Sequence, residues 1–166
     1  MNANLNTKFP VWCLRLSAVA ALIGIILLII FYSIYLGAGK TNIFGPLNDI
    51  AVVIQYVLML PLVFTFHQKL KVPRLQLSLF SSFIGLLGMI GVIILQNMLI
   101  FGFIPFSKQI GIVSIFFFIT LGWFLLNRKL DQDHSFLPKS LTLTIFAGLV
   151  FGYPIWAWKT ANKLSE

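Results

Sequence analysis

The sequence predicts an all-α integral membrane bundle of five transmembrane helices, and three observations support this fold class. First, 59% of the 166 residues are apolar and 10% are charged, with a mean hydropathy of +0.97. Soluble domains carry about 25% charged residues and disordered chains have low hydrophobicity, so both classes are excluded. Second, the stretch from Leu75 to Ser107 contains no charged side chain. Third, four shorter uncharged stretches flank it, so we expect a single polytopic domain over residues 1–166.

The first predicted span covers residues 16–36, after a basic N-terminal segment that contains Lys8 and Arg15. This run of about 21 residues is longer than the roughly 7–15 expected of a signal-peptide core. The segment that follows it is a poor cleavage site. We therefore expect an uncleaved first helix.

The second and third predicted spans cover residues 50–66 and 77–101. Gly45-Pro46 breaks any helix before the second span, and Asn48 or Asp49 is a suitable N-cap for it. A helix rises about 1.5 Å per residue, so the third span crosses the roughly 30 Å hydrocarbon core with room to tilt. The third span is thus the longest membrane-crossing helix that the sequence predicts.

The fourth and fifth predicted spans cover residues 111–126 and 141–158. Trp123 lies near one end of the fourth span, and Trp156 and Trp158 lie near the end of the fifth. Tryptophan is enriched at both membrane interfaces, which supports these boundaries.

The distribution of Lys and Arg predicts the orientation. Alternating spans place eight of these residues on one side and four on the other, the first set being Lys8, Arg15, Lys69, Lys71, Arg74, Arg128, Lys129 and Lys139, the second Lys40, Lys108, Lys159 and Lys163. The positive-inside rule then predicts a cytoplasmic N-terminus and an outside C-terminus. Basic residues confined to short connections are typical of topology signals and lipid contacts, which argues against nucleic-acid binding. Brief loops favour a prokaryotic plasma membrane.

Small residues follow one face of three predicted spans. Ser17, Ala21 and Gly24 share a stripe on the first span. Ser81, Gly85 and Gly88 share a stripe on the third span, and Gly148 and Gly152 form a GxxxG pair on the fifth. Small residues let helix backbones approach closely in lipid. We expect these stripes to pack against other helices, and the third span to contact at least three neighbours. Besides the lipid bilayer, the partners that this pattern favours are another membrane protein or a second copy.

A set of polar residues gathers toward the predicted outer side. On the second span, Asn48, Asp49, Gln55 and Tyr56 lie within about 120° of one another. Gln55 and Gln96 fall at similar depth, roughly 10 Å below the outer interface. Buried amides without partners are costly, so these two should meet each other, water or a ligand. The residues of this hypothetical ligand site are Tyr32, Asp49, Gln55, Tyr56, Gln96 and Asn97.

Two interpretations of this polar set stay open. In one, the side chains form interhelical hydrogen bonds and nothing more, and Asp49 is an N-cap. In the other, they line an outward-facing polar crevice between the first three helices, with Asp49 at its mouth and the glutamines at its floor.

Sequence motifs for catalysis or metal binding are missing. No Lys, Arg, Asp or Glu lies deep in a span, which argues against a proton relay or ion-coupled pump. Metalloprotease, phosphate-loop and nucleophile-elbow motifs are absent. Asp131, Asp133 and His134, with His67 on the same side, resemble a solvated turn more than a metal site. We therefore expect no enzyme activity, no metal and no cofactor.

The sequence thus favours a non-catalytic membrane subunit or accessory protein that acts through helix–helix contacts. The alternative is a carrier or binder of a small apolar or amphipathic molecule in the outer crevice. An intramembrane enzyme comes third, because no acid–base pair is visible.

Overall fold

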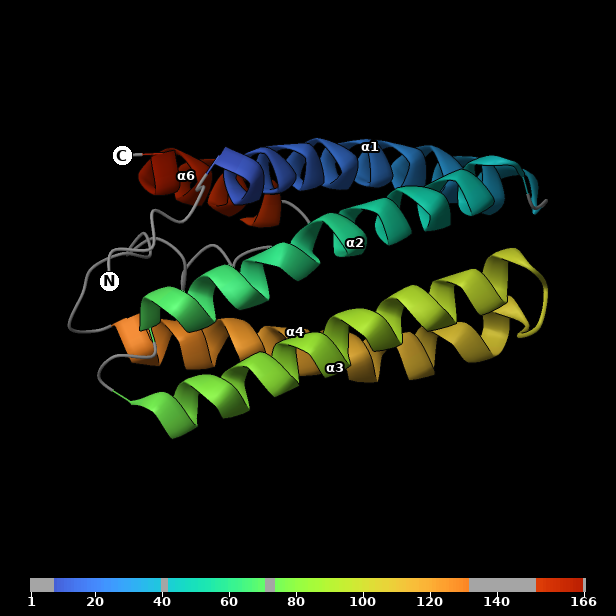
Figure 1. Ribbon diagram of the computed structural model, residues 1–166. Coiled ribbons are helices and arrows are strands. Elements are labelled where there is room, and N and C mark those ends of the chain that lie inside the picture. The colour runs from blue at the N-terminus through green and yellow to red at the C-terminus, as the bar shows by residue number, and fades with distance from the viewer. Residues whose placement is uncertain (1–7, 40–41, 71–73, 132–151, 166) are drawn as a thin grey trace.

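The chain folds as an all-α protein. The computed structural model describes residues 8–39, 42–70, 74–131 and 152–165. This part contains the helices α1 (Lys8–Ala38), α2 (Phe44–Leu70), α3 (Leu75–Ile100), α4 (Phe106–Leu130) and α6 (Gly152–Ser165) (Figure 1). Four of them, α1 to α4, are long and apolar enough to cross a membrane, and α6 is not. The chain is therefore a helical protein with four candidate membrane spans.

The four spanning helices extend beyond the predicted segments at most of their ends. α1 begins at Lys8 instead of residue 16, and α4 continues past residue 126 to Leu130. Apolarity marks only the part of a helix that lies in hydrocarbon. Flanking residues such as Arg128 and Lys129 are good helix formers, so the backbone hydrogen bonds continue into the interface.

The start of α2 corrects the predicted N-cap. The backbone N–H of Phe44 donates to Oδ1 of Asn42 at 3.0 Å, so Asn42 caps the helix. Pro46 falls in the first turn, where a helix tolerates the missing N–H. Asn48 and Asp49 consequently lie inside α2, and the prediction that one of them caps it was wrong.

α2 lies between the two halves of the bundle. It packs on α1, α3 and α4, whereas α3 packs mainly on α4 and α2 (Figure 1). Among the described helices, the central position that we predicted for the third span therefore belongs to α2. α3 packs on two neighbours, and its glycines allow an especially close approach to one of them.

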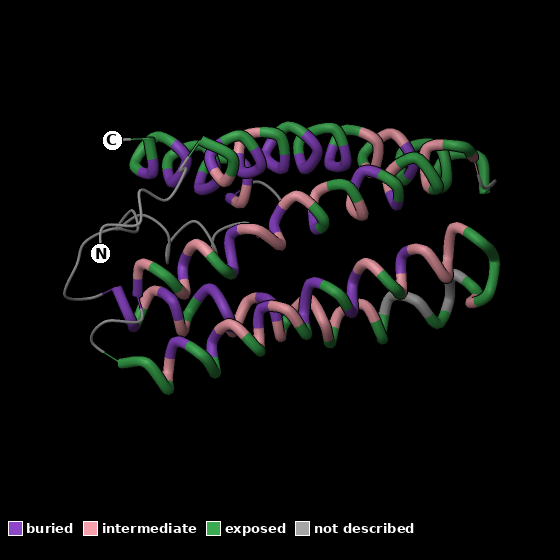
Figure 2. The backbone as a smooth tube through the Cα atoms, in the orientation of Figure 1, coloured by how far each residue is buried: buried purple, intermediate pink, exposed green. Residues whose placement is uncertain are grey.

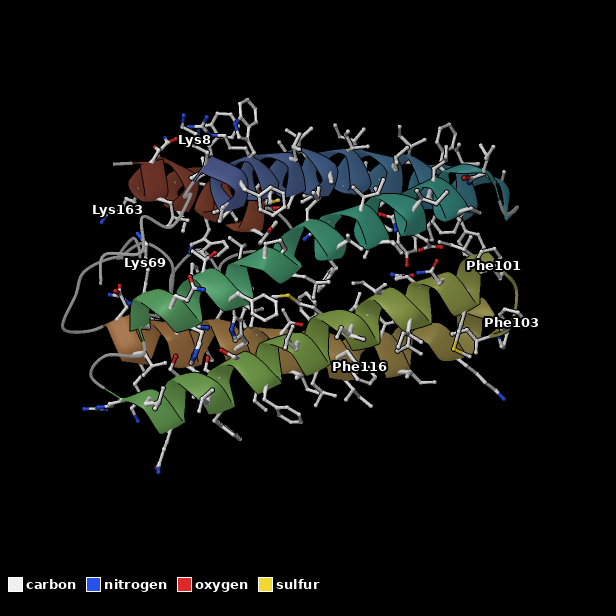
Figure 3. All side chains as sticks on the ribbon, in the orientation of Figure 1. Lys8, Lys69, Phe101, Phe103, Phe116 and Lys163 are labelled. Carbon is white, nitrogen blue, oxygen red and sulfur yellow. The ribbon has the colours of Figure 1, made fainter. Side chains whose placement is uncertain are left out.

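That neighbour is α4. A Cβ built at Gly88 would lie 2.5 Å from Oγ1 of Thr120 and 2.8 Å from its backbone nitrogen. A Cβ at Gly85 would lie 2.6 Å from Cδ1 of Trp123. Gly91 is similarly pressed against Phe116, which Figure 3 labels. Only glycine allows this separation of the two helices.

The other residues of the predicted packing stripes are placed as follows. Ser81 is buried on the same helix as Gly85 and Gly88. Gly152 is buried at the start of α6, and Gly148 lies outside the described residues.

The fifth predicted span, residues 141–158, is corrected in its described part. Residues 141–151 are outside the described part, and α6 runs from Gly152 past Trp158 to Ser165. With 14 residues it measures about 21 Å, less than the hydrocarbon thickness of roughly 30 Å. Its buried face, Trp156, Ala157, Thr160, Ala161 and Leu164, recurs at helical spacing, while Lys159 and Lys163 are exposed. This pattern is amphipathic. The predicted span was defined by an apolar run that ends at Trp158, so it did not include the second half of this helix.

The end of α6 lies beside the start of α1. The guanidinium of Arg15 donates to Oδ1 of Asn162 at 3.1 Å and lies 5.6 Å from the ring centroid of Trp158. Lys8, Lys69 and Lys163 gather at this basic end, and Phe101 and Phe103 lie at the opposite, aromatic end (Figure 3). The sequence predicted that the start of the first helix and the end of the last helix lie on opposite sides. In the structure they lie at the same end of the bundle.

Four aromatic residues form the core of the basic half. Phe66 stacks on Trp123 with centroids 5.5 Å apart, and Phe124 meets Trp156 edge-on at 4.7 Å. Each of the four is at least nine-tenths buried. We call this cluster, which joins α2, α4 and α6, the aromatic core.

The outward faces of α1 to α4 are apolar. Large exposed side chains include Ile26, Phe64, Phe83 and Phe118. Figure 2 shows exposed residues along the outer sides of the bundle and buried ones where helices meet. Such a surface suits a lipid bilayer and not water.

Candidate ligand cavity

A cavity of about 220 Å³ lies between the helices. We call it the central cavity. Every described helix contributes to its wall, the lining residues being Ala21, Gly24, Ile25, Leu28, Asn48, Val52, Gln55, Tyr56, Val92, Gln96, Val113, Phe117 and Tyr153. Most of this wall is aliphatic, and its polar members are two tyrosines and three carboxamides.

Two further hollows adjoin the central cavity. A small chamber of about 40 Å³ shares Gln55 and Tyr153 with it and reaches the aromatic core at Trp156. A larger outer hollow of about 560 Å³ shares Asn48 with it and is also lined by Asp49. The three hollows therefore follow one another from the aromatic end of the bundle to the aromatic core.

One tyrosine hydroxyl of the wall is already paired. Tyr153 Oη lies 2.7 Å from Oγ of Ser17 on α1. The Tyr56 side chain faces Thr120 on α4. The bond to Ser17 fixes the Tyr153 ring as a rigid part of the wall.

Two carboxamides of α2 are unpaired. Neither Asn48 nor Gln55 hydrogen-bonds with any residue in the part of the chain that the structure describes. Oδ1 of Asn48 lies 3.4 Å from a Cβ built at Gly24, so this amide rests against the backbone of α1. An amide without a hydrogen bond in apolar surroundings costs on the order of 2 kcal/mol or more. The central cavity thus presents two polar groups that need a partner.

Three of the six predicted site residues line the central cavity together: Gln55, Tyr56 and Gln96. Gln96 is 5% exposed and faces the cavity from α3. Gln55 and Gln96 are not hydrogen-bonded to each other. The two glutamines therefore share the wall of one cavity without bonding each other.

The other three predicted residues lie elsewhere. Asp49 is 8% exposed and lines the outer hollow. Nδ2 of Asn97 donates to the backbone oxygen of Ile93 at 2.7 Å, a bond within its own helix. Tyr32 is 38% exposed, and its ring packs edge-on against Phe31 at 5.2 Å. Neither Asn97 nor Tyr32 belongs to the wall of the central cavity.

Two polar wall residues were not among the predicted six. Asn48 precedes Gln55 by two helical turns and shares its face, a signal present in the sequence but assigned to capping. Tyr153 belongs to a helix whose position next to α1 could not be read from the sequence.

The predicted acidic turn shows no metal geometry in its described part. Asp131 is buried and lies 3.9 Å from Nη1 of Arg128, while Asp133 and His134 are outside the described residues. Nδ1 of His67 is 2.9 Å from Oγ of Ser78. Across residues 8–39, 42–70, 74–131 and 152–165, no three His, Cys, Asp or Glu side chains are grouped to hold a metal.

No protein-family model, curated protein or solved structure matches this chain. Function must therefore be inferred from the cavity. Its described wall contains no carboxylate, amine, imidazole or thiol, the groups that carry acid–base or nucleophilic chemistry. What it offers is shape, apolar surface and hydrogen bonds.

Proposed function

We propose that this protein is a non-catalytic membrane protein that binds a small, uncharged amphipathic molecule in the central cavity. The observation that carries the proposal is a cavity walled by all five described helices, mostly aliphatic, with unpaired amides. Ligand sites in proteins commonly have this make-up: apolar walls with a few placed polar groups.

Size and charge define the ligand further. An apolar protein cavity of about 150 Å³ holds one benzene molecule, so the 220 Å³ here suits roughly ten non-hydrogen atoms. A charged ligand would lose its hydration without gaining an opposite charge from the wall. The ligand is therefore small and neutral.

The cavity is also the reason to rank binding above a purely structural subunit role, which the sequence favoured. A protein that acts only through its outer helix faces gains stability by filling its interior, because voids destabilise by about 24 cal/mol per Å³. A bound ligand would offset the cost of this void and of its unpaired polar groups. A subunit role is the second candidate, supported by the apolar outer faces of α1 to α4.

We place the basic end in the cytoplasm of a cell. In the described chain this end carries most of the cations, Lys8, Arg15, Lys69, Arg74, Arg128, Lys129, Lys159 and Lys163, and Lys108 lies near the aromatic end. Cytoplasmic loops are rich in Lys and Arg, so both the start of α1 and the end of α6 are assigned to the cytoplasm. The outer hollow, and through it the central cavity, then faces the outside.

Two neighbouring alanines of α1 provide a matched test. Ala21 lines the central cavity, whereas Ala20 lines a groove on the outer surface between α1 and α2. Leucine at position 21 fills part of the cavity, and leucine at position 20 fills part of the groove instead. The probe is 4-fluorobenzyl alcohol, a neutral amphipathic molecule within the size limit, followed by fluorine NMR in lipid nanodiscs.

We expect saturable line broadening of the probe with the wild type and Ala20→Leu, and its loss with Ala21→Leu. Empty nanodiscs give the non-saturable background. Equal broadening with both variants, or none with the wild type, would contradict binding in the central cavity.

A further inference from the structure

The two unpaired amides of α2 have a fixed geometric relationship. Asn48 and Gln55 are seven residues apart, so they share one helix face and are separated by about 10 Å along the axis. Asn48 lies where the central cavity adjoins the outer hollow, and Gln55 lies where it adjoins the small chamber. The amides therefore mark the two ends of the central cavity.

The wall between these ends is apolar. Val52 lies between them on α2, and Ile25 and Val92 line the same cavity from α1 and α3. The Tyr153 hydroxyl has a partner in Ser17, and the Tyr56 side chain faces Thr120. Gln96, the third carboxamide of the wall, already interacts within the protein. A bound molecule thus meets an unused hydrogen-bonding group at each end and mostly hydrocarbon in between.

Asn48 is available for this role because of how α2 begins. Asn42 supplies the N-cap, so the amide of Asn48 is not needed by the helix terminus. Opposite it, Gly24 has no side chain that would cover the amide. Each carboxamide offers both a donor and an acceptor, so it can bind a hydroxyl, a carbonyl or another amide.

We propose that the ligand is a linear neutral molecule with two hydrogen-bonding groups about 10 Å apart, one bound by Asn48 and the other by Gln55. This inference rests on the proposed function and specifies its ligand class: a bifunctional molecule such as a diol, a hydroxy amide or a hydroxy ester. Apolar chain between the groups packs on Ile25, Val52 and Val92. Molecules with one polar group use one amide and leave the other unpaired.

The test uses the side-chain NH₂ signals of Asn48 and Gln55 in nitrogen–proton NMR spectra of the full chain in nanodiscs. Asn48→Leu and Gln55→Leu assign the signals. The probes are octanediol with a hydroxyl at each end, octan-1-ol, and pentanediol with a hydroxyl at each end. We expect octanediol to shift both NH₂ signals, and octan-1-ol and pentanediol to shift one at most.

Affinity gives a second measure. Loss of one neutral hydrogen bond should weaken octanediol binding by about threefold to tenfold in either variant. Octan-1-ol, which satisfies a single amide, should lose less. Gln68→Leu is the control, because Gln68 is an exposed amide of the same helix outside the central cavity.

The outcomes separate this inference from the proposed function. If octan-1-ol binds as tightly as octanediol and neither NH₂ signal moves, while methyl signals of Val52 and Val92 do, the cavity binds ligands but the two-amide inference is wrong. If no probe moves the methyl signals either, the proposed function fails with it. Should a leucine variant not fold, Asn48→Ser or Gln55→Ser assigns the signal in its place, and the NH₂ shifts in the wild type decide.

Discussion

The hydroxyl oxygens of Ser17 on α1 and Tyr153 on α6 lie 2.7 Å apart although 136 positions separate them in the sequence. Ser17 also donates its one hydroxyl proton to the backbone oxygen of Leu14 at 2.8 Å. Tyr153 is therefore the donor and Ser17 the acceptor in the bond between the helices. This bond fastens the first turn of α6 to α1 and holds the Tyr153 ring in the wall of the central cavity.

The first prediction concerns this bond. Tyr153→Phe and Ser17→Ala should each lower the free energy of unfolding, and the double variant should lose less than the sum of the two. Hydrogen bonds between helices in membrane proteins contribute about 0.6 kcal/mol on average, which sets the expected coupling energy. Chemical unfolding in mixed micelles measures all four proteins. Additive losses would mean that the two hydroxyls are not coupled.

The second prediction concerns the packing of α3 on α4. Gly88→Ala should be strongly destabilising, because the new Cβ would meet both the backbone nitrogen and Oγ1 of Thr120. Overpacking of a well-packed contact costs about 1–3 kcal/mol. Thermal unfolding in detergent measures the change.

Gly122 on α4 is the matched control. A Cβ at this position meets no atom within 4 Å. Alanine favours a helix over glycine by about 0.5–1 kcal/mol, so Gly122→Ala should be neutral or stabilising. Equal destabilisation at positions 88 and 122 would show that α3 and α4 are not pressed together at Thr120.

The sequence identified the spans but not their full extent. Long uncharged runs predict the helices because only a helix of about 20 apolar residues satisfies its own backbone in hydrocarbon. Their ends depend on capping and tertiary contacts, which apolarity does not report. Asn42 and Asn48 are equally suitable caps by residue type, and only the structure shows which is used. For α6, the apolar count obscured an amphipathic pattern.

The candidate site was partly predictable for a similar reason. Depth follows from counting residues along a helix, which is why Gln55 and Gln96 were expected at one level, and both line the central cavity. Rotation about a helix axis depends on the neighbours, and Tyr32 illustrates this, since its helix turns that side chain outward. Tyr153 required the position of α6, which no local pattern specifies.

The third prediction concerns topology. Alkaline phosphatase fused after Glu166 should be inactive, and the same enzyme inserted at Gly102, in the turn between α3 and α4, should be active outside the cell. The end of α6 lies beside Arg15 at the basic end, and the positive-inside rule assigns that end to the cytoplasm. Activity at both positions would show that the C-terminal segment reaches the outside.

The last prediction compares the two glutamines of the central cavity, which should respond to the same substitution with opposite sign. In the ligand-free protein the amide of Gln55 has no hydrogen-bond partner among the described residues, whereas Gln96 is 5% exposed and already interacts. Leucine is close to glutamine in volume but has no polar group that needs pairing. Gln55→Leu should therefore raise the free energy of unfolding, by about 1 kcal/mol, and Gln96→Leu should lower it by a similar amount.

Thermal unfolding in nanodiscs without added ligand measures both. If Gln55→Leu destabilises the protein as much as Gln96→Leu, the Gln55 amide has a partner, and the central cavity is held together by its polar groups instead of being kept open for a ligand.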